Sequence, residues 1–107
     1  MAIYYSAAFK RQVKRLVQRY PKIRDDIQPT IHALESGKTP GNRIQGTGCV
    51  LYKVRIKNTS AARGKSGGYR IIYYLQTAND VLLVTIYSKS EQSDITTSEL
   101  LSIIKEE

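Results

Sequence analysis

Hydrophobic residues recur at helical spacing along the first part of the chain, after a short extended start. The apolar run Ile3-Tyr4-Tyr5 predicts a strand, and Ser6 directly after it is a candidate helix N-cap. Apolar residues then return every three or four positions as far as Tyr20-Pro21, which predicts an amphipathic helix. The buried face of this helix is expected to hold Phe9, Val13, Leu16, Val17 and Tyr20.

The outward face of the same helix carries positive charges without acidic partners. Like charges four residues apart each cost a few tenths of a kcal/mol. Either a partner surface or simple solvation would account for this arrangement. The cations are Lys10, Arg11, Lys14, Arg15 and Arg19.

A second helical pattern follows and predicts a helical hairpin. We expect this helix to begin near Asp25-Asp26, whose carboxylates suit the positive end of a helix dipole. With Asp26 as the N-cap, Pro29 lies in the first turn, where its missing N–H is not needed. Gly37 ends the helix, and residues 37–49, rich in Gly, Pro and Asn, predict an irregular connection.

The hydrophobic period then changes to two, which predicts a strand with two different faces along VLYKVRIK, residues 50–57. Alternating polar and apolar positions place one face in the core and leave the other accessible. An unbroken row of cations on the accessible face favours a binding surface over a merely solvated one. The core face holds Val50, Tyr52, Val54 and Ile56, and the opposite face holds Leu51, Lys53, Arg55 and Lys57.

Two more strands and a helix complete the pattern. Tyr69–Leu75 and Val81–Ser88 are predicted strands joined by a short turn, which fits an antiparallel meander. The last strand is almost wholly apolar, so we expect it to lie centrally or to be covered on both faces. Thr96 and Glu99 form a T-x-x-E capping box, which predicts a helix beginning at Thr97.

This order of elements predicts one α+β domain over residues 1–107. An N-terminal strand and a helical hairpin are followed by a three-stranded antiparallel meander and a C-terminal helix. The strands are expected to join into one antiparallel sheet with the helices packed on it.

The distribution of charge adds a functional expectation. Seventeen Lys and Arg against nine Asp and Glu give a net charge of +8, and residues 36–79 contain eight basic and no acidic side chains. Such a segment is expected to attract polyanions, either nucleic acid or an acidic protein. The alternative is a basic protein whose charge serves only solubility.

The stretch RGKSGGYRIIYY, residues 63–74, first raises the possibility of a nucleotide-binding phosphate loop at Gly64-Lys65-Ser66. Such a loop needs a glycine where this chain has Thr59, and a helix after Ser66. The residues after Gly68 predict a strand instead, so both requirements fail. The remaining interpretation is a basic groove for backbone phosphates, in which Arg70 joins Lys53 and Arg55 on one sheet face and Arg63 and Lys65 reach over from the loop.

Other features exclude several classes of protein. Cys49 is the only cysteine, so no internal disulfide or structural zinc site is expected. The first fifteen residues contain no uninterrupted apolar segment, so we expect no signal peptide and no membrane association. The default expectation is therefore a cytoplasmic protein without a metal or other cofactor.

Three motifs together resemble a known group. LYKVRIKN, GKSGGYRIIYY and VLLVTIYSKSEQSDIT, in this order of elements, are similar to the RelE/ParE superfamily of bacterial toxin-antitoxin toxins, nearest to its RelE/HigB-like branch. The resemblance covers nearly the whole chain. It implies a type II toxin that cleaves mRNA in the ribosomal A site and so inhibits translation. It also implies a cognate antitoxin whose acidic helix or tail covers the basic surface and through which the complex binds operator DNA.

The resemblance also implies roles for individual residues. Arg70 matches the arginine proposed to stabilise the developing phosphorane charge, and Lys65 matches a basic residue in the preceding loop. Lys89 and Glu91 match the segment that supplies further catalytic groups in relatives. Some relatives carry a tyrosine in the C-terminal segment, whereas nothing after Tyr87 is aromatic here, which leaves the acid and base open. Lys53, Arg55, Lys57 and Arg63 are the expected RNA-binding residues.

The expected reaction is metal-independent attack by the RNA 2′-hydroxyl, which needs a base, an acid and donors for the phosphorane oxygens. Crowded cations lower one another's pKa, so Lys65 or Lys89 could transfer the proton, with Glu91 as base or orienting group. Two alternatives remain from the sequence alone. One is a ParE-like inhibitor of DNA gyrase without nuclease activity, and the other is a non-catalytic RNA-binding module.

Overall fold

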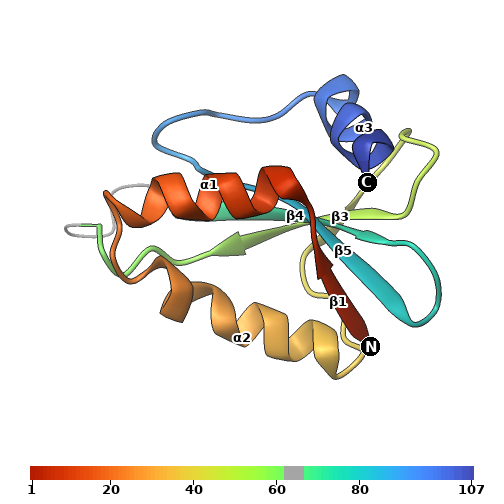
Figure 1. Ribbon diagram of the computed structural model, residues 1–107, viewed down its shortest axis with the longest axis horizontal. Helices are drawn as coiled ribbons and strands as arrows, with labels where there is room; N and C mark the ends of the chain where they lie inside the picture. The colour runs from red at the N-terminus through yellow and green to blue at the C-terminus, as the bar shows by residue number, and fades with distance from the viewer. Residues whose placement is uncertain (62–66) are drawn as a thin grey trace.

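The fold is a five-stranded sheet with helices on both faces (Figure 1). The computed structural model describes residues 1–61 and 67–107. Among these residues, no helix has the length and apolar character needed to cross a bilayer. In chain order the elements are β1 (Ala2–Tyr5), α1 (Ala7–Val17), α2 (Ile23–Glu35), β2 (Asn42–Ile44), β3 (Leu51–Ile56), β4 (Tyr69–Leu75), β5 (Asp80–Ser88) and α3 (Thr97–Glu106).

The strands lie in the order β1-β5-β4-β3-β2, and the sheet is mixed. Strands β2 to β5 pair antiparallel, which confirms the predicted meander. Strand β5 lies inside the sheet between β1 and β4 and is buried along nearly all its length, in line with its apolar sequence. Strand β1, however, runs parallel to β5, so the prediction of a wholly antiparallel sheet was wrong. The alternation of apolar residues carries no information about strand direction, because parallel and antiparallel strands share the same side-chain period.

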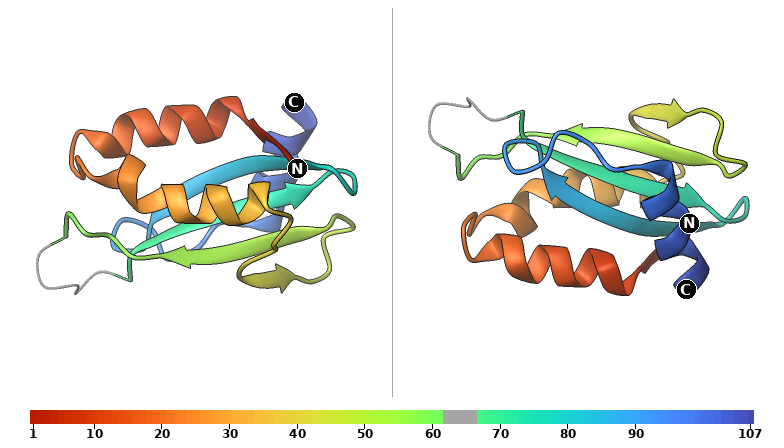
Figure 2. Two further views of the ribbon diagram at one scale, coloured as in Figure 1. Left: turned by 90° about the horizontal axis from the view of Figure 1, so that it is seen from below. Right: turned by 90° about the horizontal axis from the view of Figure 1, so that it is seen from above.

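The two faces of the sheet are covered by different helices. The α1–α2 hairpin packs over one face, where Val54, Ile71 and Leu83 belong to the larger core. Helix α3 packs over part of the other face, where Leu100 joins Leu51 in a second apolar cluster. The two views of Figure 2 show this division, with α2 in front of the sheet in one and α3 in front of it in the other.

The caps at the starts of α1 and α3 are those predicted. Ser6 Oγ accepts a hydrogen bond from the Phe9 backbone N–H at 2.9 Å, which caps α1. Thr96 and Glu99 form the reciprocal capping box of α3. The buried Ser6 hydroxyl also donates to the Val84 carbonyl oxygen at 2.5 Å, so one side chain joins the start of α1 to the centre of the sheet.

A β-bulge lies in the middle of β5. The register passes from Ile72 opposite Thr85 to Tyr73 opposite Leu83, so Val84 is an extra residue on β5. The bulge carbonyl is the one to which Ser6 donates, so the irregular backbone remains hydrogen-bonded.

Helix α2 begins earlier than predicted. Its first residue is Ile23, which is fully buried, and this burial extends the helix toward the N-terminus. Asp26 is consequently inside the first turn instead of capping it, and its carboxylate accepts hydrogen bonds from the backbone N–H and the hydroxyl of Thr59. Pro29 lies within the helix, where its missing N–H leaves the carbonyl of Asp25 without the usual helical partner.

The segment predicted to be irregular, residues 37–49, contains a further strand. Strand β2 pairs antiparallel with the start of β3, with Asn42 opposite Lys53. Gly41 makes this approach possible because its φ is +92° and a Cβ atom there would lie 2.3 Å from the Lys53 carbonyl oxygen. Three residues are too few to show a period in the sequence. Cys49 packs half-buried against the apolar cluster beneath α3.

Candidate functional site

Two arginines face each other at the end of the sheet away from α3. Arg55 of β3 lies directly opposite Arg70 of β4, and Lys53 shares their face two residues earlier. This confirms the predicted convergence of Arg70 with Lys53 and Arg55. Side chains directly opposite in an antiparallel pair have Cβ atoms about 5 Å apart.

The Arg55–Arg70 pair is unfavourable for the fold by itself. Like charges directly opposite on neighbouring strands destabilise a sheet. An anion bound between the two guanidinium groups would offset that repulsion, and Arg forms paired hydrogen bonds with phosphate. The arrangement is therefore better suited to binding a phosphate than to stabilising the sheet.

Arg70 is oriented by backbone carbonyls. Its Nη1 donates to the carbonyl oxygens of Gly67 and, at 3.3 Å, Tyr69. Within the described residues these bonds use one of the guanidinium nitrogens, whereas Arg has five N–H donors in all. The half-buried group is thus fixed in direction and is suited to meet an anion.

Lys89 lies beside Arg70 because Gly67 has no side chain. A Cβ atom at Gly67 would lie 2.6 Å from Lys89 Cγ and 3.7 Å from Arg70 Nη2. The Lys89 backbone N–H donates to the Gly68 carbonyl at 2.9 Å, and its Nζ donates to the Ser93 carbonyl. The structure therefore brings the stem of the Lys89 side chain close to Arg70. We call Lys53, Arg55, Arg70 and Lys89 the basic site.

Asp94 supplies a carboxylate to this site that sequence reasoning missed. Its Oδ1 accepts from Lys53 Nζ at 2.9 Å, from the Ile95 backbone N–H at 2.8 Å and from the Tyr87 hydroxyl at 3.3 Å. The hydrogen bond from Lys53 is the main reason that the pKa of Asp94 lies below its ordinary value. The ion pair therefore stabilises the fold above the ordinary carboxyl pKa, and that stabilisation is lost as the pH falls through the lowered value.

Tyr87 is the second residue that the sequence did not assign. It lies directly opposite Arg70 on β5 and is 2% exposed. Burial, followed by the charge of Asp94 and the hydrogen bond to it, raises the pKa of Tyr87 to about 12, while Arg70 acts in the opposite direction. Tyr87 is therefore a neutral hydrogen-bond donor throughout the physiological range.

This coupling can be measured through the phenol. We expect Asp94→Asn to lower the pKa of Tyr87 from about 12, because the substitution removes a negative charge that disfavours tyrosinate. Burial should keep the value above the 10 or so of an exposed tyrosine. The measurement is a pH titration of Cζ-labelled tyrosine by NMR, with Tyr87→Phe to assign the resonance. An unchanged titration in Asp94→Asn would exclude the coupling.

Glu91 is held on the other side of the segment that follows β5. Its two carboxylate oxygens pair with Arg15 at 3.0 Å and with Arg19 at 3.3 Å, both beyond the sheet on the α1 side. The structure therefore does not bring the Glu91 carboxylate to the basic site. Instead, Glu91 ties the start of the segment from Lys89 to Asp94 to α1.

Of the three remaining predicted site residues, the structure describes one. Lys57 follows the end of β3 and is exposed. Arg63 and Lys65 are outside the described residues, so their predicted roles stay predictions.

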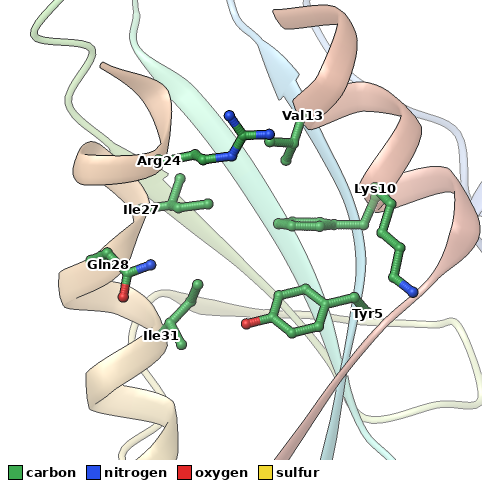
Figure 3. Close-up of a pocket in the computed structure, with 8 residues that line it drawn as sticks. Tyr5, Lys10, Val13, Arg24, Ile27, Gln28 and Ile31 are labelled. Carbon is green, nitrogen blue, oxygen red and sulfur yellow. The ribbon is translucent and has the colours of Figure 1, made fainter. Parts of the chain in front are cut away.

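A separate crevice of about 270 Å³ lies between α1 and α2 (Figure 3). Its lining is partly apolar and partly polar, and Arg24 extends from α2 toward α1. The residues that line it include no carboxylate and no histidine, so we assign it no reaction. They are Tyr5, Phe9, Lys10, Val13, Arg24, Ile27, Gln28 and Ile31.

The fold and the basic site define a small α+β protein with a strongly basic surface at one end of its sheet. A family model described as the RelE toxin of the RelE / RelB toxin-antitoxin system matches residues 1–106. The chain therefore belongs to the RelE toxin family. It is the toxin of a type II toxin-antitoxin system, and toxins of this family pair with a RelB-type antitoxin.

Proposed function

We propose that this toxin is a ribosome-dependent endoribonuclease that cleaves mRNA in the A site and so inhibits translation. The observation that carries the proposal is the Arg55–Arg70 pair, with Lys89 beside it across Gly67. Family membership supports the reaction, because RelE toxins are generally ribonucleases. The proposed reaction uses the substrate's own 2′-hydroxyl as the attacking group, which RNA has and DNA lacks.

The bond changes follow from this substrate. A base takes the proton of the 2′-hydroxyl and the 2′-oxygen attacks phosphorus. The bond from phosphorus to the 5′-oxygen breaks as that oxygen takes a proton from an acid, and the products are a 2′,3′-cyclic phosphate and a 5′-hydroxyl. Negative charge grows on the phosphorane oxygens, and Arg70 with Arg55 would stabilise it. Donors aimed at such charge commonly contribute factors of 10² to 10³ to the rate. Lys53 and Lys57 would bind neighbouring phosphates.

Lys89 is the proposed proton-transfer residue within the described part of the chain. The stem of its side chain lies beside Gly67 near Arg70, and its Nζ donates to the Ser93 carbonyl oxygen. From there Lys89 would give a proton to the departing 5′-oxygen. Lys65 is the alternative that the sequence supplies. Asp94 would act indirectly by holding Lys53 and the Tyr87 hydroxyl in place.

For Glu91, the ion pairs favour orientation over proton transfer. Its carboxylate is shared by Arg15 and Arg19, which would have to release it before it could act as a base. We expect Glu91→Gln to weaken the attachment of the Lys89 segment and to lower the cleavage rate severalfold without changing the pH profile. Loss of the acidic limb of that profile would instead make Glu91 the base.

The proposal predicts a specific pattern of mRNA breakage. Inducing the toxin alone and mapping mRNA 5′ ends should show cuts that follow the codon phase, only in messages that are being translated. Cuts in untranslated RNA would remove the requirement for the ribosome. Intact mRNA accompanied by DNA damage would instead indicate a gyrase inhibitor and would sink the proposal.

A further inference from the structure

Asp94 places a carboxylate above the strand that carries Arg70. Lys53 and Tyr87, which both donate to its Oδ1, belong to β3 and β5, the two strands on either side of β4. A group that contacts both of them lies over β4, where Arg70 has Arg55 on one side and Tyr87 on the other. In Figure 2, the segment from β5 to α3 runs over the same face of the sheet as α3. The surface proposed to bind the reacting phosphate therefore has a carboxylate beside it.

The two oxygens of this carboxylate differ in their surroundings. Oδ1 accepts from Lys53, from Tyr87 and from the Ile95 backbone N–H, and these bonds fix the direction of the group. In the part of the chain that the structure describes, Oδ2 accepts no hydrogen bond, and the side chain is 62% exposed. A carboxylate that is oriented through one oxygen and open at the other is suited to take a proton from a bound molecule.

The other carboxylate of the same segment does not meet these conditions. Glu91 has both oxygens paired with arginines on the α1 side. Among the ion pairs of the described residues, the one between Asp94 and Lys53 is the only one that involves the basic site. Asp94 is therefore the better candidate for proton transfer at this site.

Lys53 connects Asp94 to the binding of substrate. Its ammonium group lies 2.9 Å from Asp94 Oδ1, and a phosphate that reaches the basic site would compete with the carboxylate for it. Loss of the bond from Lys53 would remove the main cause of the lowered pKa of Asp94, and the charge of the phosphate would raise that pKa further. A pKa closer to the working pH makes a carboxylate a more effective base.

We propose that Asp94 does more than hold its partners: it is the base that takes the 2′-hydroxyl proton, released for this step when a substrate phosphate replaces it on Lys53. The inference rests on the proposed function and names a residue for a role that the sequence left open. The proton of the 2′-hydroxyl passes to Asp94 Oδ2, the 2′-oxygen bonds to phosphorus, and the 5′-oxygen leaves with a proton from Lys89. Asp94 ends protonated and Lys89 neutral, and proton exchange with water restores both.

The charged and titratable groups around Asp94 come from three strands and from its own segment. Lys53 of β3 pairs with it, Tyr87 of β5 donates to it, and Arg70 of β4 lies beyond Tyr87. Lys89 donates to the backbone carbonyl of the residue before Asp94. Of these residue types, only aspartate ordinarily titrates on the acid side of neutrality, so a loss of rate on acidification would report its protonation.

The first experiment measures single-turnover cleavage of mRNA on stalled ribosomes as a function of pH. Asn keeps an oxygen that can accept from Lys53 but carries no charge, so Asp94→Asn should lower the rate by roughly 10² to 10⁴ and abolish the acidic limb. Asp94→Glu keeps a carboxylate and should retain that limb at an intermediate rate. An unchanged acidic limb in Asp94→Asn would overturn the inference and leave the nuclease standing, whereas absence of cleavage by the wild-type protein would overturn both.

The second experiment measures the competition for Lys53 without any cleavage. The probe is a labelled RNA trinucleotide with 2′-O-methyl groups, which cannot react by 2′-hydroxyl attack, and fluorescence anisotropy gives its affinity. We expect Asp94→Asn to bind it about fivefold more tightly, because the variant removes a negative charge a few ångströms from the phosphate. Weaker binding would mean that Asp94 only supports Lys53, and would overturn the inference.

A matched control makes the same change of charge elsewhere. Asp25 is exposed in the first turn of α2, on the opposite side of the sheet, and Asp25→Asn should change the affinity by less than about twofold. Equal gains in the two variants would mean that net charge alone governs binding, and would count against the exchange at Lys53. Thermal unfolding checks that both variants remain folded.

Discussion

Arg70→Ala is expected to lower the rate of RNA cleavage by roughly 10² to 10³ and to abolish growth arrest. The substitution removes the guanidinium that Gly67 and Tyr69 orient, together with half of the Arg55–Arg70 pair. The fold should survive, because the change also removes the repulsion between the two arginines. Cleavage of translated mRNA after induction gives the rate, and a thermal melt checks the fold.

Two further variants make this result specific. Arg70→Lys keeps the charge but not the paired N–H donors, so we expect an intermediate rate. Arg43→Ala makes the same chemical change on β2, outside the basic site, and should leave cleavage unchanged. Wild-type toxicity in Arg70→Ala would remove Arg70 from the mechanism, whereas equal losses at Arg43 would point to a general effect of charge.

Gly68→Ala is expected to destabilise the protein by about 3 kcal/mol or more. The φ of Gly68 is +74°, and a Cβ atom would lie 2.2 Å from the Ile56 carbonyl oxygen, so the start of β4 would have to move away from the end of β3. For a chain of this size, each kcal/mol corresponds to roughly 4–8 °C in Tm. Urea unfolding and thermal melts measure the loss.

Gly37→Ala separates the conformational cost of a positive φ from the cost of a steric clash with the neighbouring strand. Gly37 also has a positive φ, +86°, but a Cβ atom there would have no neighbour within 4 Å. This variant should therefore show only the conformational cost, about 1–2 kcal/mol. If Gly68→Ala cost no more than Gly37→Ala, the close approach of the two strands would not contribute.

The elements and the arginine pair could be predicted because local patterns encode them. The period of two placed Lys53 and Arg55 on the same face, and the strand after Gly68 carried Arg70 to it. The caps of α1 and α3 likewise depend on residues three positions apart, such as Thr96 and Glu99. Predicting these features requires only residues that are close in the sequence and the side-chain periods of the helix and the strand.

The features that were missed depend on contacts between distant segments. Asp94 follows β5 by a few residues, and only the folded chain shows that it meets Lys53 of β3 at 2.9 Å. Glu91 was predicted to act at the site together with Lys89, yet in the folded chain its carboxylate pairs with Arg15 and Arg19 on the α1 side. No local period records where an irregular segment turns, so these side chains could not be assigned from the sequence.

The extra residue at Val84 acts as a frame shift within β5. Before it, Leu83 faces the α1–α2 core, and strict alternation from there would turn Tyr87 toward the same core. Because one residue is added, Ile86 takes that place and Tyr87 faces Arg70 and Asp94. The two halves of β5 are thus in opposite frames. Deleting Val84 would leave Ile86 toward the core and Tyr87 toward Arg70, whereas a strand that paired Val84 regularly with Ile72 would place Ile86 opposite Arg70 and turn the phenol into the core.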